Sequence, residues 1–209
     1  MKKTVSGLLS LVLVLAALLS CASCSKEKTP AAGGWTPVGS PEISAELRAL
    51  FVLALDDFVG STVEPVAYLA TQVVAGTNHL VLCRTAPVVP DPVETYSVVT
   101  LYEALDGSAK IIDVKDTGVE THVASAVTAG GWAQTLPTIP DDLKERFVKA
   151  AGEGYELVAL LSQQVVAGMN YCVLVEPEDG FAGPETKYSF LHFYVDLKGD
   201  VTVTPGQKS

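Results

Sequence analysis

The sequence contains one pentapeptide twice, and this repetition constrains the fold more than any other feature. Gln72 to Gly76 reads Gln-Val-Val-Ala-Gly, and Gln164 to Gly168 repeats it letter for letter 92 residues later. Each copy follows one apolar run and precedes another, with Asn78 and Asn170 in step behind the glycines. This pattern indicates a β-hairpin with glycine at its tip, because glycine reaches positive φ without a Cβ clash. The spacing suits a duplicated domain of ordinary small size.

Both copies occur within the same expected order of secondary structure. Each repeat reads as one helix followed by four strands, because a run with helical spacing precedes β-rich runs separated by turn residues. In the first repeat the helix is expected at 40–60 and the strands at 64–75, 77–85, 96–103 and 110–114. In the second the helix, expected to be shorter, is placed at 140–151 and the strands at 155–167, 169–176, 188–197 and 201–204.

The first helix has one apolar face that can cover a sheet. Ser40 and Pro41 provide a cap and a first-turn proline, and Gly60 is expected to end the helix. The residues on the apolar face are Ile43, Leu47, Leu50, Phe51, Ala54, Leu55 and Phe58. The expected fold class is therefore α+β: two tandem domains, each with one helix packed across a four-stranded, possibly five-stranded, antiparallel sheet.

The first twenty residues are expected to be an export signal rather than part of the fold. Two lysines precede an apolar run at 8–19, which is short for a bilayer span and ends in small residues. The run ending at Cys21 resembles a bacterial lipoprotein signal, so Cys21 would carry lipid and residues 21–32 would form a tether. The protein is then exported and lipid-anchored to the bacterial cell envelope. Simple secretion, with cleavage near Ser23, is the alternative.

The charge balance argues against two classes of partner. The formal net charge is −10, and loss of Lys2 and Lys3 with the signal would make it −12. Nucleic-acid binding needs a basic surface, and anionic lipid headgroups repel an acidic protein. We therefore expect no nucleic-acid partner, contact with a membrane only through the lipid anchor, and a monomer.

Two cysteines fall within the expected fold, one in each repeat. Cys83 and Cys172 are not equivalent, because a shift of 92 residues takes Cys83 to Val175. A disulfide within a repeat is excluded. A bridge between the repeats is conceivable outside the cytoplasm, although the apolar surroundings favour buried free thiols.

Further residues repeat in step with the pentapeptide. Gly33-Gly34-Trp35 and Gly130-Gly131-Trp132 each precede an expected helix. Gly-Gly-Trp, then a helix, then Gln-Val-Val-Ala-Gly at a hairpin tip resembles the cystatin family of cysteine-protease inhibitors, and the stefins and plant cystatins in particular. The resemblance covers both repeats. It implies cystatin-like domains at 33–115 and 130–204, a linker at 116–129 and a tail at 205–209.

The resemblance implies a three-part wedge that enters the active-site cleft of papain-like cysteine proteases. Its parts are the N-terminal glycines, the first hairpin tip and the second hairpin tip. In the first repeat the corresponding residues are Gly33, Gly34, Gln72, Val73, Val74, Ala75, Gly76 and Leu105. In the second they are Gly130, Gly131, Gln164, Val165, Val166, Ala167, Gly168 and Leu197. Many relatives outside the stefins have Pro-Trp in the third part. Its absence here lowers the expected affinity, because a large aromatic residue is a common hot spot.

The residues of the wedge also suit this role physically. A protease cleft is narrow and desolvated, and Val-Val-Ala-Gly has no charge to desolvate and little side-chain entropy to lose. We therefore expect reversible, non-covalent inhibition. One alternative is that the hairpins serve folding alone. Another is that the protein is a non-inhibitory surface lipoprotein whose cystatin-like domains bind a protein or a glycan.

No arrangement of residues in the sequence points to catalysis or metal binding. His79, His122 and His192 lack metal-ligand spacing, and Cys83 lies among apolar residues. No Gly-x-Ser-x-Gly, phosphate-loop or dinucleotide motif occurs. We expect no enzymatic activity, no metal and no cofactor.

Overall fold

The computed structural model describes residues 33–121, 130–178 and 180–205. All of them fall within one compact unit, Ala31–Ser209. The expected signal, the tether with Cys21, most of the expected linker and the end of the tail lie outside the described residues. Within the described ranges, no helix is long and apolar enough to cross a membrane.

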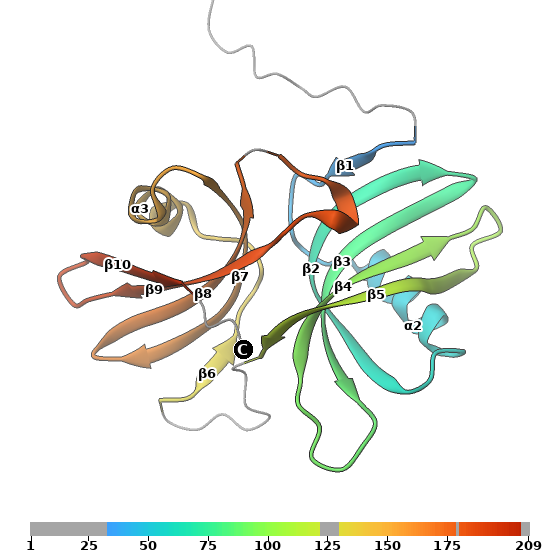
Figure 1. Cartoon of the computed structure of the whole chain (residues 1–209), viewed down its shortest axis with the longest axis horizontal. Helices are drawn as coiled ribbons and strands as arrows, with labels where there is room; N and C mark the ends of the chain where they lie inside the picture. Colours follow the sequence, from blue (N-terminus) through green and yellow to red (C-terminus); the bar gives the residue numbers. More distant parts are fainter. Residues whose placement is uncertain (1–32, 122–129, 179, 206–209) are drawn as a thin grey trace, which may run out of the picture. The chain divides into compact units, whose positions relative to one another are not determined.

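The first repeat forms a five-stranded antiparallel sheet and one helix (Figure 1). Across the sheet the strands follow chain order: β1 (Trp35–Pro37), β2 (Ser61–Val74), β3 (Gly76–Pro87), β4 (Thr95–Glu103) and β5 (Ala109–Glu120). Helix α2 (Ala45–Leu55) lies between β1 and β2 in the chain. Strands β2 and β3 form the hairpin around the first pentapeptide, with Val74 opposite Gly76.

The second repeat has the same order of elements. Its sheet contains β6 (Trp132–Gln134), β7 (Tyr155–Val166), β8 (Gly168–Pro177), β9 (Ser189–Val195) and β10 (Val201–Pro205), again in chain order. Helix α3 (Asp141–Ala151) lies between β6 and β7, and the 3-10 turn η2 (Gly183–Glu185) lies between β8 and β9. Val166 stands opposite Gly168 in the second hairpin.

Ser44, rather than Ser40, caps helix α2. The backbone N–H of Leu47 donates to Ser44 Oγ at 3.2 Å, which satisfies one of the free N–H groups of the first turn. The predicted start at Ser40 was wrong, because Ser44 offers the same cap immediately before the apolar run. The predicted inner face was confirmed: Leu47, Phe51 and Ala54 are buried, and the other apolar residues of that face pack against them.

Helix α3 has the same length as α2, so the expectation of a shorter second helix was wrong. Both contain 11 residues. Gly152 ends α3 at a φ of 73°, and its N–H donates to the carbonyl of Val148. Helix α2, by contrast, already ends at Leu55, before Gly60, the glycine that was expected to stop it.

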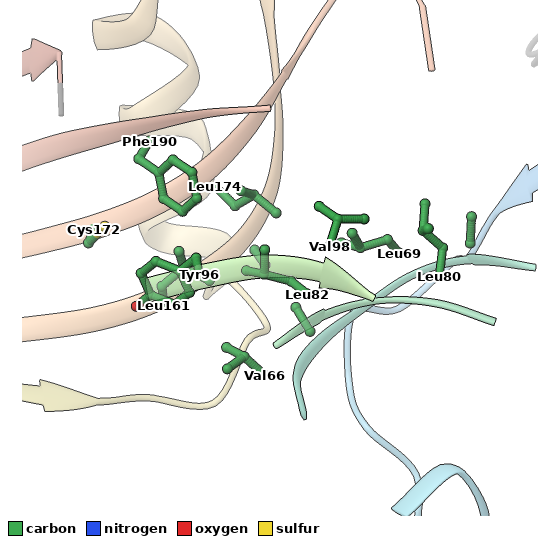
Figure 2. Packing of buried hydrophobic residues seen from close by; sticks show 13 residues of the cluster. Val66, Leu69, Leu80, Leu82, Tyr96, Val98, Leu161, Cys172, Leu174 and Phe190 are labelled. Atoms are coloured by element: carbon green, nitrogen blue, oxygen red, sulfur yellow. The ribbon is translucent and has the colours of Figure 1, made fainter. Parts of the chain in front are cut away.

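Strand β3 is buried on both faces, and this determines how the sheets are covered. Successive side chains of a strand point to opposite faces. Leu80 and Leu82 belong to one buried cluster, whereas Val81 and Cys83 belong to another with helix α2. The cluster around Leu80 also takes in residues of the second repeat (Figure 2): Ala159, Leu161, Cys172, Leu174 and Phe190. Each sheet therefore packs against its own helix on one face and against the other sheet on the second face.

The predicted fold class was wrong. About half of the described residues lie in strands, in two five-stranded antiparallel sheets, and the described chain has only two α-helices. The sheets share one buried cluster, so the structure is mainly β rather than two tandem α+β domains of one helix and four strands each. The prediction failed because it gave each sheet a single apolar face. A central strand such as β3 is instead apolar at nearly every position, as expected for burial on both faces.

Strand β5 is longer than predicted. It continues to Glu120, whereas the sequence suggested a strand at 110–114 and a linker from residue 116. Thr117 Oγ1 donates to the carbonyl of Tyr96 at 2.7 Å, which fastens this extension to β4. The small and β-branched residues that indicated a linker therefore lie, up to Glu120, in the edge strand of the first sheet.

Candidate functional site

The two pentapeptides lie at exposed hairpin tips. Val73 is 72% exposed and Val165 64%, while Gly76 and Gly168 begin the returning strands. The two leucines that were assigned to the second hairpin tips are also exposed. Much of the surface of these apolar side chains is exposed and can contact another molecule.

In the first sheet, strand pairing brings the three predicted segments to one end. Trp35 of β1 stands opposite Gln72, so the glycines before Trp35 lie beside the hairpin tip. Glu103, the last residue of β4, stands opposite Thr77. The turn with Leu105 follows directly, and Leu105 is 88% exposed. The N-terminal glycines, the first tip and the second tip are therefore neighbours at the end of this sheet (Figure 1).

The second sheet repeats this arrangement. Trp132 stands opposite Gln164, and Met169 stands opposite Val195, after which the turn with Leu197 follows. We call the two sets of residues tip surface one (Gly33, Gly34, Gln72 to Gly76 and Leu105) and tip surface two (Gly130, Gly131, Gln164 to Gly168 and Leu197). Every residue predicted for the site thus belongs to one of two equivalent groups.

A glutamine amide ties the first segment to the hairpin in each tip surface. Gln72 Nε2 donates to the carbonyl of Gly33 at 2.8 Å, and Gln72 Oε1 accepts from Asn78 Nδ2 at 2.7 Å. In tip surface two, Gln164 makes the same pair of bonds, with the same distances. These glutamines were predicted to contact a protease, and that stays a prediction. Their amides are engaged within the protein, so they also position the glycine segment.

A tyrosine ties the hairpin tip to the next strand. The hydroxyl of Tyr102 donates to the carbonyl of Ala75, and the hydroxyl of Tyr194 donates to the carbonyl of Ala167. These tyrosines were not among the predicted site residues. Their signal was available, because they recur at the 92-residue spacing of the tips.

The pentapeptide glycines are required by close packing on the neighbouring strand. Gly76 and Gly168 both have a φ of 125°, a region that side chains with a Cβ rarely adopt. A Cβ on Gly76 would lie less than 3.0 Å from the carbonyl oxygen of Glu103, and one on Gly168 would meet the carbonyl oxygen of Val195 in the same way. In each tip surface, the glycine lets the pentapeptide hairpin lie directly against the strand that leads to the leucine turn: β4 in the first sheet and β9 in the second.

The two leucine turns, one in each sheet, are held by aspartate side chains within the turns themselves. In tip surface one, Asp106 accepts from the backbone N–H of Ser108 at 2.9 Å and from its hydroxyl at 2.7 Å. These bonds lower the pKa of Asp106 below its ordinary value. In tip surface two, Asp196 accepts from the N–H groups of Lys198 and Asp200. Both turns are closed by carboxylates, which leaves the leucines pointing outward.

A polar chain supports tip surface one alone. His79 lies between the Tyr68 hydroxyl, 2.7 Å from Nδ1, and the Glu103 carboxylate, 3.1 Å from Nε2. Burial and the negative charge of Glu103 raise the pKa of Tyr68 to about 12, so the phenol keeps its proton at neutral pH. At the matching positions the second repeat has Leu160, Tyr171 and Val195, which pack in an apolar cluster.

The two described cysteines are buried free thiols that point to opposite faces of their sheets. Cys83 packs on the helix side, and Cys172 lies in the cluster shared by both sheets. Burial raises the pKa of both thiols, that of Cys172 to about 12. The prediction of buried free thiols, favoured over a bridge between the repeats, was confirmed for this pair.

Among the described residues, those of the tip surfaces protrude, and none of them lines the hollow that the structure describes. The hollow described by the structure, of about 330 Å³, is lined by residues such as Val38, Leu69, Ile139, Lys144, Glu176 and Tyr188, none of which belongs to a tip surface. In the described ranges, no group of three or more His, Cys, Asp or Glu side chains is arranged to hold a metal ion. The tips therefore suit insertion into a groove of another protein better than capture of a small ligand.

The fold and the site together define a mainly β protein of two packed sheets with two equivalent, protruding apolar surfaces. No protein-family model matches the sequence, and no curated protein matches it. The resemblance to the cystatin family therefore stays a prediction from the repeated motifs.

Proposed function

We propose that this protein is a reversible, non-covalent inhibitor of papain-like cysteine proteases, and that its tip surfaces block the active-site cleft. One observation supports this above all. Three segments that are far apart in the sequence meet at one end of each sheet, where they expose valine, alanine, glycine and leucine. These are the segments that the motif resemblance assigned to a protease-blocking wedge.

The apolar character of the tips favours binding in a desolvated groove. Val73 and Leu105 are exposed in the free protein, and burying such a side chain completely contributes about 1.5–3 kcal/mol. No charged residue lies within Gln72 to Gly76, so no ion has to be desolvated. A leucine offers less contact area than an aromatic anchor, so we expect moderate rather than extreme affinity.

The internal hydrogen bonds of the tips favour binding by limiting the loss of entropy. The Tyr102 hydroxyl holds the Ala75 carbonyl, and Gln72 holds the Gly33 carbonyl. A surface that is ordered before binding has less conformational freedom to lose on association.

The same bonds explain how the tip could enter a protease without being cleaved. Attack by a thiolate requires the scissile carbonyl carbon about 3–3.5 Å away in a defined orientation. Both arms of the hairpin are paired in the sheet, and the carbonyl of Ala75 already accepts a hydrogen bond from Tyr102. The tip therefore cannot relax readily into an extended substrate geometry.

The direct test is to mix the mature protein with papain and to measure how fast papain hydrolyses a peptide substrate. Inhibition at micromolar concentration or below is expected. The double substitution Val73→Asp and Val165→Asp should raise the inhibition constant at least tenfold, because each new carboxylate would have to be desolvated in a protease cleft. Val59→Asp is a matched control, since Val59 is 88% exposed and lies outside both tip surfaces. Full papain activity at micromolar wild-type protein would refute inhibition.

The alternative is a non-inhibitory surface protein that binds another protein or a glycan. Such a protein would leave papain fully active at micromolar concentration. Substitution of Gly76 and Gly168 does not distinguish the two roles, because a side chain there would displace the neighbouring strand. Val73 and Val165 are the better positions, since their side chains are largely exposed.

We also propose that the protein is exported and anchored through lipid on Cys21. The sequence of residues 1–21 supports this proposal. Mass spectrometry of the mature N-terminus in a bacterial host should find an acylated cysteine, and Cys21→Ser should release the protein from the membrane fraction. An unmodified N-terminus near Ser23 would indicate secretion instead.

A further inference from the structure

The two sheets pack with their tips directed away from each other. Trp35 pairs with Gln72 beside tip surface one, and its indole lies against Gly183, where an added Cβ would stand 3.0 Å or closer to the ring. Gly183 follows β8, which starts at tip surface two with Gly168 and ends at Pro177. The end of the first sheet that carries tip surface one therefore contacts the second sheet at the end opposite tip surface two.

Other contacts between the sheets agree with this opposite orientation. Tyr96 is the second residue of β4 and Phe190 the second residue of β9, so both are far from their tips, and their rings stack with centroids 5.2 Å apart. Lys115 forms an ion pair with Glu185 in the turn far from tip surface two. If the sheets ran in the same direction, Trp35 could not reach that turn.

In the part of the chain that the structure describes, neither tip surface belongs to the buried contact between the sheets. The shared buried cluster contains no residue of tip surface one or two. Val73, Val165, Leu105 and Leu197 are all exposed in the same structure. Occupation of one tip surface therefore neither requires nor covers the other.

From this arrangement, and on the basis of the proposed inhibitory function, we infer that one molecule binds two papain-like proteases at the same time, one at each end. Strands β2 and β7 have 14 and 12 residues, and at about 3.3 Å per residue the tips of oppositely directed sheets lie roughly 40 Å apart. A globular protein of about 200 residues has a radius of gyration of about 16–17 Å. Two such partners that approach from opposite ends do not overlap.

The experiment is to measure the mass of the complex with papain whose catalytic thiol has been carboxymethylated, so that no turnover occurs. With excess papain, light scattering of wild-type protein should give two papain molecules per chain. Val73→Asp should leave one, bound at tip surface two, and Val165→Asp should leave one, bound at tip surface one. Val59→Asp should still bind two. Because each single variant retains one intact tip surface, its remaining binding also reports that the chain is folded.

Two results would overturn simultaneous binding while leaving inhibition intact. If wild-type protein binds one papain and both single variants still bind one, the tip surfaces exclude each other. If wild-type protein binds one papain and only Val73→Asp abolishes binding, tip surface two is inactive. Absence of any complex with the wild-type protein is a different outcome, because it would refute the proposed inhibition itself.

Discussion

The ring of Tyr96 stacks on the ring of Phe190 across the contact between the two sheets, with centroids 5.2 Å apart and planes inclined by 25°. Tyr96 is 2% exposed and Phe190 6%. Each ring comes from a different repeat, so neither sheet completes its core alone. Offset stacking of this kind adds about 0.5–1.5 kcal/mol to the burial of the rings.

Removal of one of these rings should destabilise both repeats together. Phe190→Ala is expected to lower the free energy of unfolding by about 3–5 kcal/mol, through lost burial and the cavity that remains. Urea unfolding, followed by the fluorescence of Trp35 and Trp132, should show one common transition before and after the substitution, because both indoles pack against the shared cluster. Leu53→Ala is the control, since Leu53 is 55% exposed. Two separate transitions would contradict a shared core.

Tyr102→Phe should weaken protease binding more than it weakens the fold. The substitution removes the hydrogen bond to Ala75 and should cost about 1 kcal/mol of stability. Without this bond the hairpin tip is less ordered, so we expect papain to dissociate faster. The measurement uses a chain that also carries Val165→Asp, so that papain binds only at tip surface one. The reciprocal pair, Tyr194→Phe with Val73→Asp, is the matched test of the second tip. An unchanged dissociation rate would show that the tyrosine has no role in binding.

Gly76→Ala should destabilise the first hairpin although it adds only a methyl group. The new Cβ would collide with the carbonyl of Glu103 in a backbone region unfavourable to alanine, at a cost of about 1–3 kcal/mol. Gly39→Ala should change stability by less than about 0.5 kcal/mol, because no atom lies within 4 Å of its added Cβ and Gly39 does not have a positive φ. Thermal unfolding of both variants provides the comparison, and equal stabilities would disprove the close packing.

The thiols of Cys83 and Cys172 should resist alkylation in the native protein. Burial raises the pKa of Cys172 to about 12, whereas an unfolded cysteine has a pKa near 8.5. The folded state therefore holds the proton more tightly. This contribution to stability is complete below about pH 8.5 and is lost as the pH rises toward 12. At pH 8, labelling of Cys83 and Cys172 with a thiol reagent, followed for each site by peptide mass spectrometry, should accompany global unfolding and accelerate in urea. Rapid labelling of either residue in the native state would contradict the buried placement.

The features that could be predicted from the sequence are those that depend on local pattern. The repeated pentapeptide indicated both hairpins, and spacing of apolar residues identified the inner face of α2. The turns that carry Leu105 and Leu197 were placed correctly between their strands, because Asp-Gly and Gly-Asp pairs separate the β-rich runs there.

The packing of one sheet on the other could not be predicted by the same means. Local periodicity shows that Leu80 to Cys83 is apolar throughout, but it does not say which element covers the second face. The hydrogen bonds that hold the tips were not predicted, although Gln72 itself was a predicted site residue and Tyr102 recurs as Tyr194. Tyr102 and Gln72 act through bonds to backbone carbonyls, and such partners leave no mark in the sequence of the accepting residue.

The shared cluster also limits how the protein can be shortened. A fragment with only one repeat would leave the face that carries Leu80, Leu82 and Tyr96 open to water, and such an apolar face promotes aggregation. A variant with one functional tip surface therefore has to be made by substituting side chains of the other tip surface in the full-length chain. Truncation to one repeat would remove the sheet that covers the apolar face of the remaining repeat.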